Sequence, residues 1–217
     1  MSSLSFSEYF KALPTKNGNS VEFPSDIFSP IISSHFQYIY LQYLQKVWSF
    51  KSFKISTPEE IFYYIYAVLY SPTYRKRYEE FLKIDFPRIP LPEDYEKFKK
   101  LSELGKELVE LHLLKHPSLG ETGVGFPESG SDEVEKVYYD ENSERVWINK
   151  SQYFDGISKD VWEYRIGAYQ VLAKYLKDRK GRKMTVDEIE HYMRVAKAIA
   201  RTIEVQGQVE EVYGKAT

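Results

Sequence analysis

The chain has 217 residues, enough to bury a sizeable core in one domain or slightly more than one. Thirty basic and 32 acidic side chains give a formal net charge of −2, so the chain as a whole is no polycation, and any nucleic-acid surface must come from local segregation of charge. The absence of cysteine excludes disulfides, thiolate metal sites and cysteine nucleophiles, and no apolar run approaches the roughly 18 to 20 residues of a membrane helix, so we expect a soluble, cytoplasmic protein with no membrane partner.

The N-terminal quarter predicts little regular structure. Prolines and glycine recur among serine and asparagine up to Pro30, which is typical of loops. We expect one short strand at residues 21–23 and a helix at residues 34–47, where aromatic side chains fall partly at helical spacing.

Two helix starts follow. Thr57, Pro58 and Glu60 combine a threonine cap, a proline in the first turn and a glutamate at the capping-box position, and the apolar run IFYYIYAVLY behind them predicts a helix buried on several sides. Ser71 and Pro72 repeat the signal before a polar helix, TYRKRYEEFLK, so the two helices should form a hairpin. Three prolines then predict a rigid, extended connector over residues 86–92.

A leucine seam marks the next helix, expected over residues 94–115. Its leucines alternate spacings of three and four, which predicts a narrow apolar stripe against a partner helix. About two heptads are filled, so packing within the fold and pairing with another molecule both stay open. The four leucines are Leu101, Leu104, Leu108 and Leu111.

The second half mixes strands and helices. Residues 117–132 read as a loop, and EVEKVYYD and ERVWINK alternate with the period of a β-hairpin. VWEYRIG predicts a strand, AYQVLAKYLKDRKG a helix closing near Gly181, and Thr185 with Glu188 a capping box that starts the last long helix. The sequence thus predicts an α+β fold: a helix-rich globule with a small antiparallel sheet and a long helix after the proline-rich joint.

Catalytic motifs are missing from the sequence. It has no Asp/Asn-Pro-Pro-aromatic tetrapeptide of amino-methyltransferases, no glycine-rich turn between a strand and a helix, and no Glu-x-Lys triplet of metal-dependent nucleases. His112 and His116 form the one i, i+4 histidine pair, which we interpret as a capping and packing pair near a helix end rather than a metal site. We therefore expect no catalytic site, metal or cofactor.

Two basic segments carry the functional signal. Charge of this density can bind nucleic-acid phosphates with salt-dependent affinity. Lys150, Gln152 and Tyr153, beside the predicted hairpin, are side-chain types that could read base edges. The candidate phosphate contacts are Arg179, Lys180, Arg182 and Lys183 in one segment, and Arg75, Lys76 and Arg77 in the other.

Several blocks in order resemble a known family. FYYIYAVLYSPTYRKRYEEFLKIDFPRIPLP, LSELGKELVELHLL, VWINKSQYFDGIS and VWEYRIGAYQVLAKYLKDRKGR, with the TVDEIEHY helix, resemble the C-terminal target-recognition domain of type ISP and related single-chain restriction-modification enzymes. The resemblance covers about residues 57–205. It implies a domain that follows a helicase-like or nuclease part and an N6-adenine methyltransferase, and that selects the DNA sequence to be methylated or cut.

The resemblance suggests a domain map: residues 1–56 as the loop-rich N-terminal part, 57–205 as the target-recognition core and 206–217 as a tail. Since the chain starts at Met1 and holds no catalytic module, we expect an excised fragment, a truncated gene or a free-standing specificity piece. Blocks that carry the resemblance should be scaffold, and sequence-reading residues should lie in stretches 17–56 and 117–132. The expected scaffold residues are Tyr164 to Gly167, Tyr169, Leu172 and Leu176.

Two hypotheses of different class result. The leading one is a non-catalytic target-recognition domain that binds double-stranded DNA and works with a methyltransferase or nuclease module in cis or in trans. The alternative is a protein-protein interaction module, in which the 94–115 helix docks a methyltransferase or a second copy of the chain.

Overall fold

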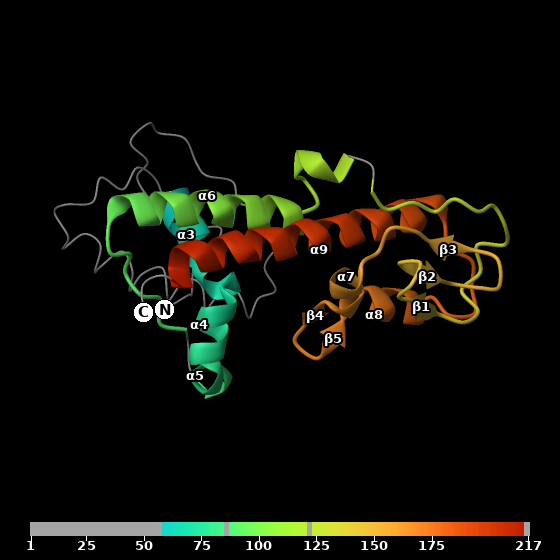
Figure 1. Ribbon diagram of the computed structural model, residues 1–217, viewed down its shortest axis with the longest axis horizontal. Helices are drawn as coiled ribbons and strands as arrows, with labels where there is room; N and C mark the ends of the chain where they lie inside the picture. The colour runs from blue at the N-terminus through green and yellow to red at the C-terminus, as the bar shows by residue number, and fades with distance from the viewer. Residues whose placement is uncertain (1–57, 85–86, 121–122, 215–217) are drawn as a thin grey trace, which may run out of the picture.

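One long helix organises the molecule. The computed structural model describes residues 58–84, 87–120 and 123–214; the predicted strand at 21–23, the helix at 34–47 and the Thr57 cap lie outside these residues. Helix α9 (Val186–Tyr213) runs the length of this part of the chain, and two groups of elements pack against its two halves (Figure 1).

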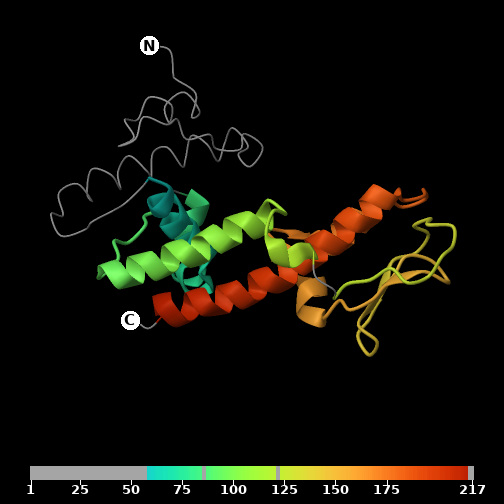
Figure 2. The same ribbon diagram turned by 90° about the horizontal axis from the view of Figure 1, so that it is seen from above.

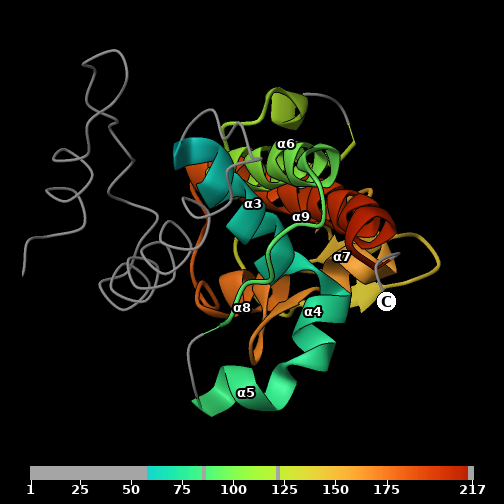
Figure 3. The ribbon, with the colours of Figure 1, turned by 90° about the vertical axis from the view of Figure 1, so that its left-hand side faces the viewer.

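The first group is helical. α3 (Pro58–Tyr70) and α6 (Tyr95–His112) lie beside the C-terminal half of α9, as the views from above and from the end show (Figures 2 and 3). α3 is buried on several sides, as its sequence predicts. α6 begins where expected, because the Asp94 side chain accepts a hydrogen bond from the backbone N–H of Lys97 at 2.8 Å. The most buried residues of this core include Phe62, Ile65, Phe98, Leu101, Leu108, Leu111 and Val205.

The leucine seam of α6 is used inside the fold. All four of its leucines are at most 8% exposed, in the core that α6 forms with α3 and α9. The leucine seam therefore does not dock another molecule, as the alternative hypothesis proposed, because its apolar side chains are already buried and offer no surface to a partner.

The predicted polar helix after Ser71 is two helices. α4 (Pro72–Arg77) and α5 (Glu79–Ile84) are separated at Tyr78, whose backbone (φ −110°, ψ 17°) leaves the helical region. Ser71 caps α4 as predicted, by accepting from the N–H of Tyr74 at 3.1 Å. The carboxylate of Glu210 in α9 accepts from the Ser71 hydroxyl and, at 3.2 Å, from the N–H of Thr73. The start of α4 is thus tied to the end of α9.

The proline connector has no regular secondary structure over residues 87–92, which is compatible with the predicted extended segment; Phe86 lies outside the described residues. Two tyrosine hydroxyls fix it to the helices: Tyr74 donates to the carbonyl of Arg88 at 3.0 Å, and Tyr64 donates to that of Pro90 at 2.9 Å. The connector is therefore held against α3 and α4.

The second group surrounds the N-terminal half of α9. The predicted hairpin is confirmed as β1 (Tyr138–Asp140) and β2 (Arg145–Trp147), and β3 (Tyr153–Phe154), which the sequence did not suggest, completes a sheet of order β1-β2-β3. The remaining elements of this group are α7 (Lys159–Glu163), β4 (Arg165–Ile166), β5 (Tyr169–Gln170) and α8 (Val171–Lys177), whereas η2 (Pro117–Gly120) follows α6 and buries Leu119 in the helical core of the first group. The core of the second group includes Val146, Ile148, Phe154, Leu172, Leu176 and Tyr192.

The strand predicted over VWEYRIG is mostly wrong. Its first half is α7, and only Arg165–Ile166 pairs, in a two-stranded hairpin with β5 that turns at Gly167 with φ +58°. Leu172 and Leu176 are fully buried as expected, but Ile166 is 58% and Tyr169 63% exposed. A two-stranded hairpin that projects from the molecule (Figure 1) has no sheet face to bury, so these side chains meet water.

The last helix begins as predicted. Thr185 and Glu188 form a complete capping box, with Thr185 Oγ1 accepting from the Glu188 N–H at 3.2 Å and Glu188 Oε2 accepting from the Thr185 N–H at 3.1 Å. α8 ends at Lys177, earlier than Gly181. α9 continues without a break past residue 206, where we expected a tail.

Candidate nucleic-acid interface

The basic loop, residues 179–183 between α8 and α9, has a fixed backbone. The Gly181 N–H donates to the Val134 carbonyl at 2.8 Å, the Val134 N–H donates to the Arg182 carbonyl at 3.0 Å, and the Met184 N–H donates to the Asp132 carbonyl at 2.8 Å. Gly181 has φ +81°, a conformation that favours glycine. The loop is therefore bonded to the 132–134 segment at both of its ends, through isolated bridges rather than as a strand of a sheet, and its backbone is held in place.

Gln152 holds the segment that supports this loop. It is fully buried, and its side-chain oxygen accepts from the Asp132 N–H at 2.8 Å and from Asn149 Nδ2 at 2.9 Å. Its amide nitrogen donates to the Glu128 carbonyl at 3.1 Å and to Asp132 Oδ1 at 2.7 Å. Every polar atom of the Gln152 side chain is thus engaged inside the protein, in a supporting position rather than at the surface.

The other two base-reading candidates differ in exposure. Lys150 is exposed in the turn between β2 and β3. Tyr153 is 9% exposed, because its ring lies 4.6 Å from that of Trp147 and 4.2 Å from the Arg145 guanidinium, measured to ring centroids. Of the three, Lys150 alone reaches solvent freely.

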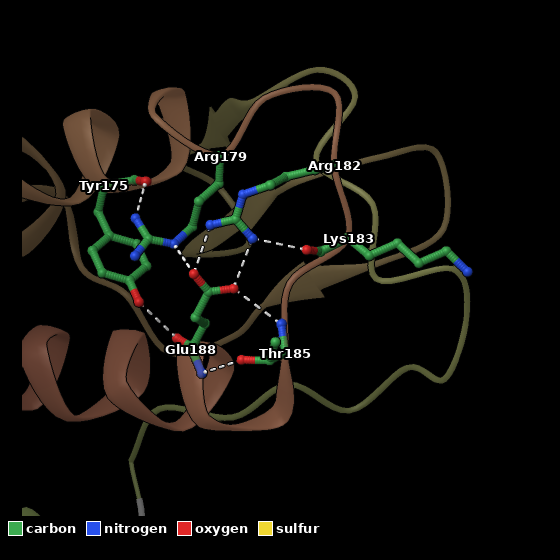
Figure 4. A network of polar contacts seen from close by, with 6 residues as sticks. All are labelled: Tyr175, Arg179, Arg182, Lys183, Thr185 and Glu188. Carbon is green, nitrogen blue, oxygen red and sulfur yellow. Dashed lines mark hydrogen bonds and ion pairs between the residues drawn. The ribbon is translucent and has the colours of Figure 1, made fainter.

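Glu188 binds both arginines of the loop (Figure 4). Its Oε1 lies 2.9 Å from Arg179 Nε and 2.7 Å from an Arg182 terminal nitrogen, and its Oε2 lies 2.9 Å from the other terminal nitrogen of Arg182. These guanidinium bonds, together with the Thr185 N–H, lower the pKa of Glu188 to about 2. The carboxylate is therefore ionised at neutral pH and compensates part of the loop's positive charge.

The two arginines are held differently, and the lysines are not held by Glu188. The Arg179 guanidinium lies 3.5 Å from the centroid of the Tyr175 ring and donates to the Tyr175 carbonyl at 2.9 Å. Lys180 and Lys183 are exposed, and Lys183 points away from the Glu188 carboxylate (Figure 4). The two lysines of the loop are thus open to solvent, whereas the two arginines are bound to the Glu188 carboxylate.

The second basic segment lies elsewhere on the molecule. Arg75, Lys76 and Arg77 are exposed in the last turn of α4, with the Arg75 guanidinium 5.1 Å from the centroid of the Tyr70 ring. Glu188 beside one segment and Glu210 beside the other are both in α9, about 33 Å apart along its axis at about 1.5 Å per residue. The structure therefore does not join the two basic segments into one patch.

The histidine pair is structural. His112 Nδ1 lies 2.8 Å from the Tyr66 hydroxyl and Nε2 lies 3.1 Å from the Thr202 hydroxyl, while His116 Nδ1 lies 2.7 Å from the Ser118 hydroxyl. Within residues 58–84, 87–120 and 123–214, no group of three or more His, Asp or Glu side chains is arranged to hold a metal ion. In the same ranges no helix is long and apolar enough to cross a membrane.

Sequence reasoning missed the role of Glu188. The capping-box pattern identified it as a helix start, but its pairing with Arg179 and Arg182 depends on the turn of the loop at Gly181. The sequence did contain a signal. Glu188 lies six positions after Arg182, and the capping box holds its side chain near the N-terminus of the helix, close to the loop. Gln152 was predicted to read bases from its side-chain type, but its burial beside β3 depends on the third strand, which was not predicted.

Solved structures of similar fold are much longer proteins bound to DNA. The chain is similar to a nuclease-deletion mutant of the Type ISP restriction-modification enzyme LlaGI in complex with a DNA substrate mimic (TM-score 0.53, 23% identity, 69% of this chain and 13% of that one). It is also similar to the ATP-dependent Type ISP restriction-modification enzyme LlaBIII bound to DNA (TM-score 0.58, 20% identity, 78% and 12%) and to the DrdV–DNA complex (TM-score 0.59, 20% identity, 90% and 21%). The chain thus spans about a fifth of those proteins or less, and the likeness shows a shared fold. No curated protein sequence matches.

A family model covers most of the chain. The model of the Type ISP C-terminal specificity domain matches residues 21–207, which include both basic segments and the whole of the β1–β3 sheet. The order of elements over this range is the one that the sequence blocks predict, with the corrections given above. The chain belongs to the family of Type ISP C-terminal specificity domains.

Proposed function

We propose that this chain binds double-stranded DNA and supplies the sequence recognition of a restriction-modification enzyme. The observation that carries the proposal is the basic loop, which carries four cationic side chains, three of them exposed, on a backbone that hydrogen bonds hold to the 132–134 segment. A rigid array of cations costs little conformational entropy when it meets a rigid array of phosphates. Membership of the specificity-domain family supports the same function.

We assign the residues distinct roles. Lys180 and Lys183 bind phosphates directly, Arg182 joins them, and Arg179 stays against Tyr175. Lys150 reaches toward base edges from the turn after β2, and Gln152 keeps the supporting segment in place. These roles combine phosphate contacts, which position a protein on DNA, with a contact that discriminates bases.

The α4 cations give a second phosphate contact. Glu188, beside the basic loop, and Glu210, beside the start of α4, are about 33 Å apart along α9, close to the roughly 34 Å of one turn of B-DNA. Phosphates one turn apart lie on the same face of a duplex. We infer that one duplex of a little more than one turn contacts both the basic loop and Arg75, Lys76 and Arg77.

The chemistry belongs, in this proposal, to another module. We propose that the chain has no catalytic site, needs no cofactor, and acts in the cytoplasm with an N6-adenine methyltransferase or a nuclease module in cis or in trans. Its isolated form should transfer no methyl group from a methyl donor to duplex DNA and should not cut it.

The direct test is a titration followed by a selection. A labelled 30-bp duplex of mixed sequence is titrated with the 217-residue chain at 50 and 200 mM salt; we expect binding that weakens with salt. Selection from randomised duplexes should then enrich one shared sequence. Absence of binding at 50 mM salt would refute DNA binding, and binding without an enriched sequence would refute recognition.

A further inference from the structure

Glu188, the acidic residue of α9 beside the basic loop, is unexpected at a phosphate-binding surface, since it repels phosphate. Glu188 accepts three hydrogen bonds from two guanidinium groups that are otherwise suited to phosphate. A carboxylate and a phosphate present the same pattern of paired oxygens to an arginine fork. In the DNA-free protein Glu188 therefore occupies the donors that a phosphate would use.

The geometry indicates which arginine can change partner. The Arg179 side chain is 20% exposed and has further contacts with the Tyr175 ring and carbonyl. The Arg182 side chain is 49% exposed, and its only other hydrogen bond within the described part of the chain is from a terminal nitrogen to the Lys183 carbonyl at 3.0 Å. Arg182 can turn outward without breaking a buried contact, whereas Arg179 cannot.

We propose that Glu188 competes with DNA phosphate for Arg182, and that Arg182 exchanges the carboxylate for a phosphate when the loop binds a duplex. This inference rests on the proposed DNA binding. Glu188 thereby lowers the affinity of the loop for any DNA. It also holds the Arg182 guanidinium in an ordered position beside the loop, where a phosphate can bind it.

The exchange leaves no uncompensated charge. After Arg182 leaves, Glu188 keeps its bond to Arg179 Nε and accepts from the Thr185 N–H at 3.1 Å. Its side chain is 21% exposed, so water can take the place of the lost donors. The carboxylate is thus stable in both states, which a competing group requires.

The variant Glu188→Gln tests the competition. Glutamine serves at the third position of a capping box as glutamate does, so the start of α9 should be kept. Without the carboxylate, we expect the chain to bind the mixed-sequence 30-bp duplex about two- to fivefold more tightly at 0.15 M salt, the size expected for losing one exposed ion pair. The slope of log K against log salt should stay close to that of the wild type, because Arg182 neutralises the same phosphate in both proteins.

Glu190→Gln is the matched control. Glu190 is exposed, and two positions along an α-helix place it about 200° around α9 from Glu188. The change in net charge is the same, so an effect of overall charge alone would appear equally in both variants. We expect Glu190→Gln to bind as the wild type does.

Arg182→Ala completes the design. Adding Glu188→Gln to Arg182→Ala should give little further tightening, since the exchanging arginine is absent. Equal affinities of Glu188→Gln and Glu190→Gln, or weaker binding by Glu188→Gln at an unchanged melting temperature, would overturn the competition and leave DNA binding standing. Absence of binding by the wild type would overturn the proposed function itself.

Discussion

Gly105 of α6 lies directly against the backbone carbonyl of Tyr63 in α3. A Cβ atom at Gly105 would stand 1.8 Å from the Tyr63 oxygen, far inside van der Waals contact. One turn earlier the Ser102 hydroxyl donates to the Glu60 carbonyl at 2.7 Å. α3 and α6 therefore cross at backbone contact, and this crossing sets the packing of the helical core.

Gly105→Ala should destabilise the protein strongly. The methyl group cannot be accommodated without moving α3 away from α6, which we expect to cost about 3 kcal/mol of unfolding free energy. Gly207 is the control: it lies in α9 with no atom within 4 Å of the added Cβ, so Gly207→Ala should raise stability by up to about 1 kcal/mol through helix propensity. Urea unfolding measures both. Equal stabilities of the two variants would contradict the close crossing.

Two buried tyrosines predict opposite responses to loss of a hydroxyl. The Tyr192 hydroxyl is buried with no hydrogen-bond partner among the described residues, whereas the Tyr64 hydroxyl donates to Pro90. Tyr192→Phe should stabilise the protein by about 1 kcal/mol, and Tyr64→Phe should destabilise it by about 1 kcal/mol. Thermal unfolding distinguishes them; a loss of stability in Tyr192→Phe would mean that its hydroxyl has a partner.

His112 predicts acid sensitivity. Burial, with the nearby Arg75 charge, lowers its pKa from 6.5 to about 4, so the fold favours the neutral ring that bonds to Tyr66 and Thr202. In the unfolded chain His112 takes up a proton below a pKa of about 6.5, whereas in the folded protein it does so only near pH 4. The free energy of unfolding that depends on the neutral ring is therefore fully present above about pH 6.5. It is lost as the pH falls toward 4, by about 3 kcal/mol in all. His112→Gln should lose less stability than the wild type between pH 7.5 and 4.5, and the exposed His191→Gln should behave as the wild type. A pH profile identical in all three proteins would rule out this role of His112.

Variants of Gln152 and Lys150 should distinguish a residue that stabilises the fold from a residue that contacts DNA. Gln152→Ala removes four hydrogen bonds and leaves buried partners unpaired, so we expect a loss of about 3 kcal/mol of stability together with weaker DNA binding. Lys150→Ala should leave the melting temperature within about 1 °C and weaken binding to the selected sequence only, because an exposed side chain contributes little to the fold. Unchanged stability in Gln152→Ala would return that residue to the base-reading role.

Local signals explain what the sequence predicted well. The caps at Ser71, Asp94 and Thr185 each depend on neighbours within four residues, and all three helices begin there. The leucine seam of α6 predicted a buried stripe, but its partner could not be derived, because α3 and α9 come from distant parts of the sequence. The exposed hairpin at Ile166 was misread because its alternation resembles that of a core strand.

The sequence predicted which residues carry the positive charge of the candidate site, but not how their side chains are arranged. Clustered cations marked the loop, since charge density is visible in sequence. The pairing of Glu188 with Arg182 and the burial of Gln152 depend on contacts between the 128–134 segment, β3 and the loop, which no short-range pattern encodes.

The most direct test of the central claim compares salt slopes for two double variants. Lys180→Ala/Lys183→Ala removes the two exposed lysines of the basic loop, and Lys100→Ala/Lys106→Ala removes two exposed lysines of α6 with the same change in charge. Duplex binding is measured between 50 and 200 mM salt. Each lost phosphate contact reduces the slope of log K against log salt by about 0.9, so the loop variant should lose up to about 1.8 and the α6 variant should match the wild type. Equal slopes in all three proteins would show that the loop does not bind phosphate.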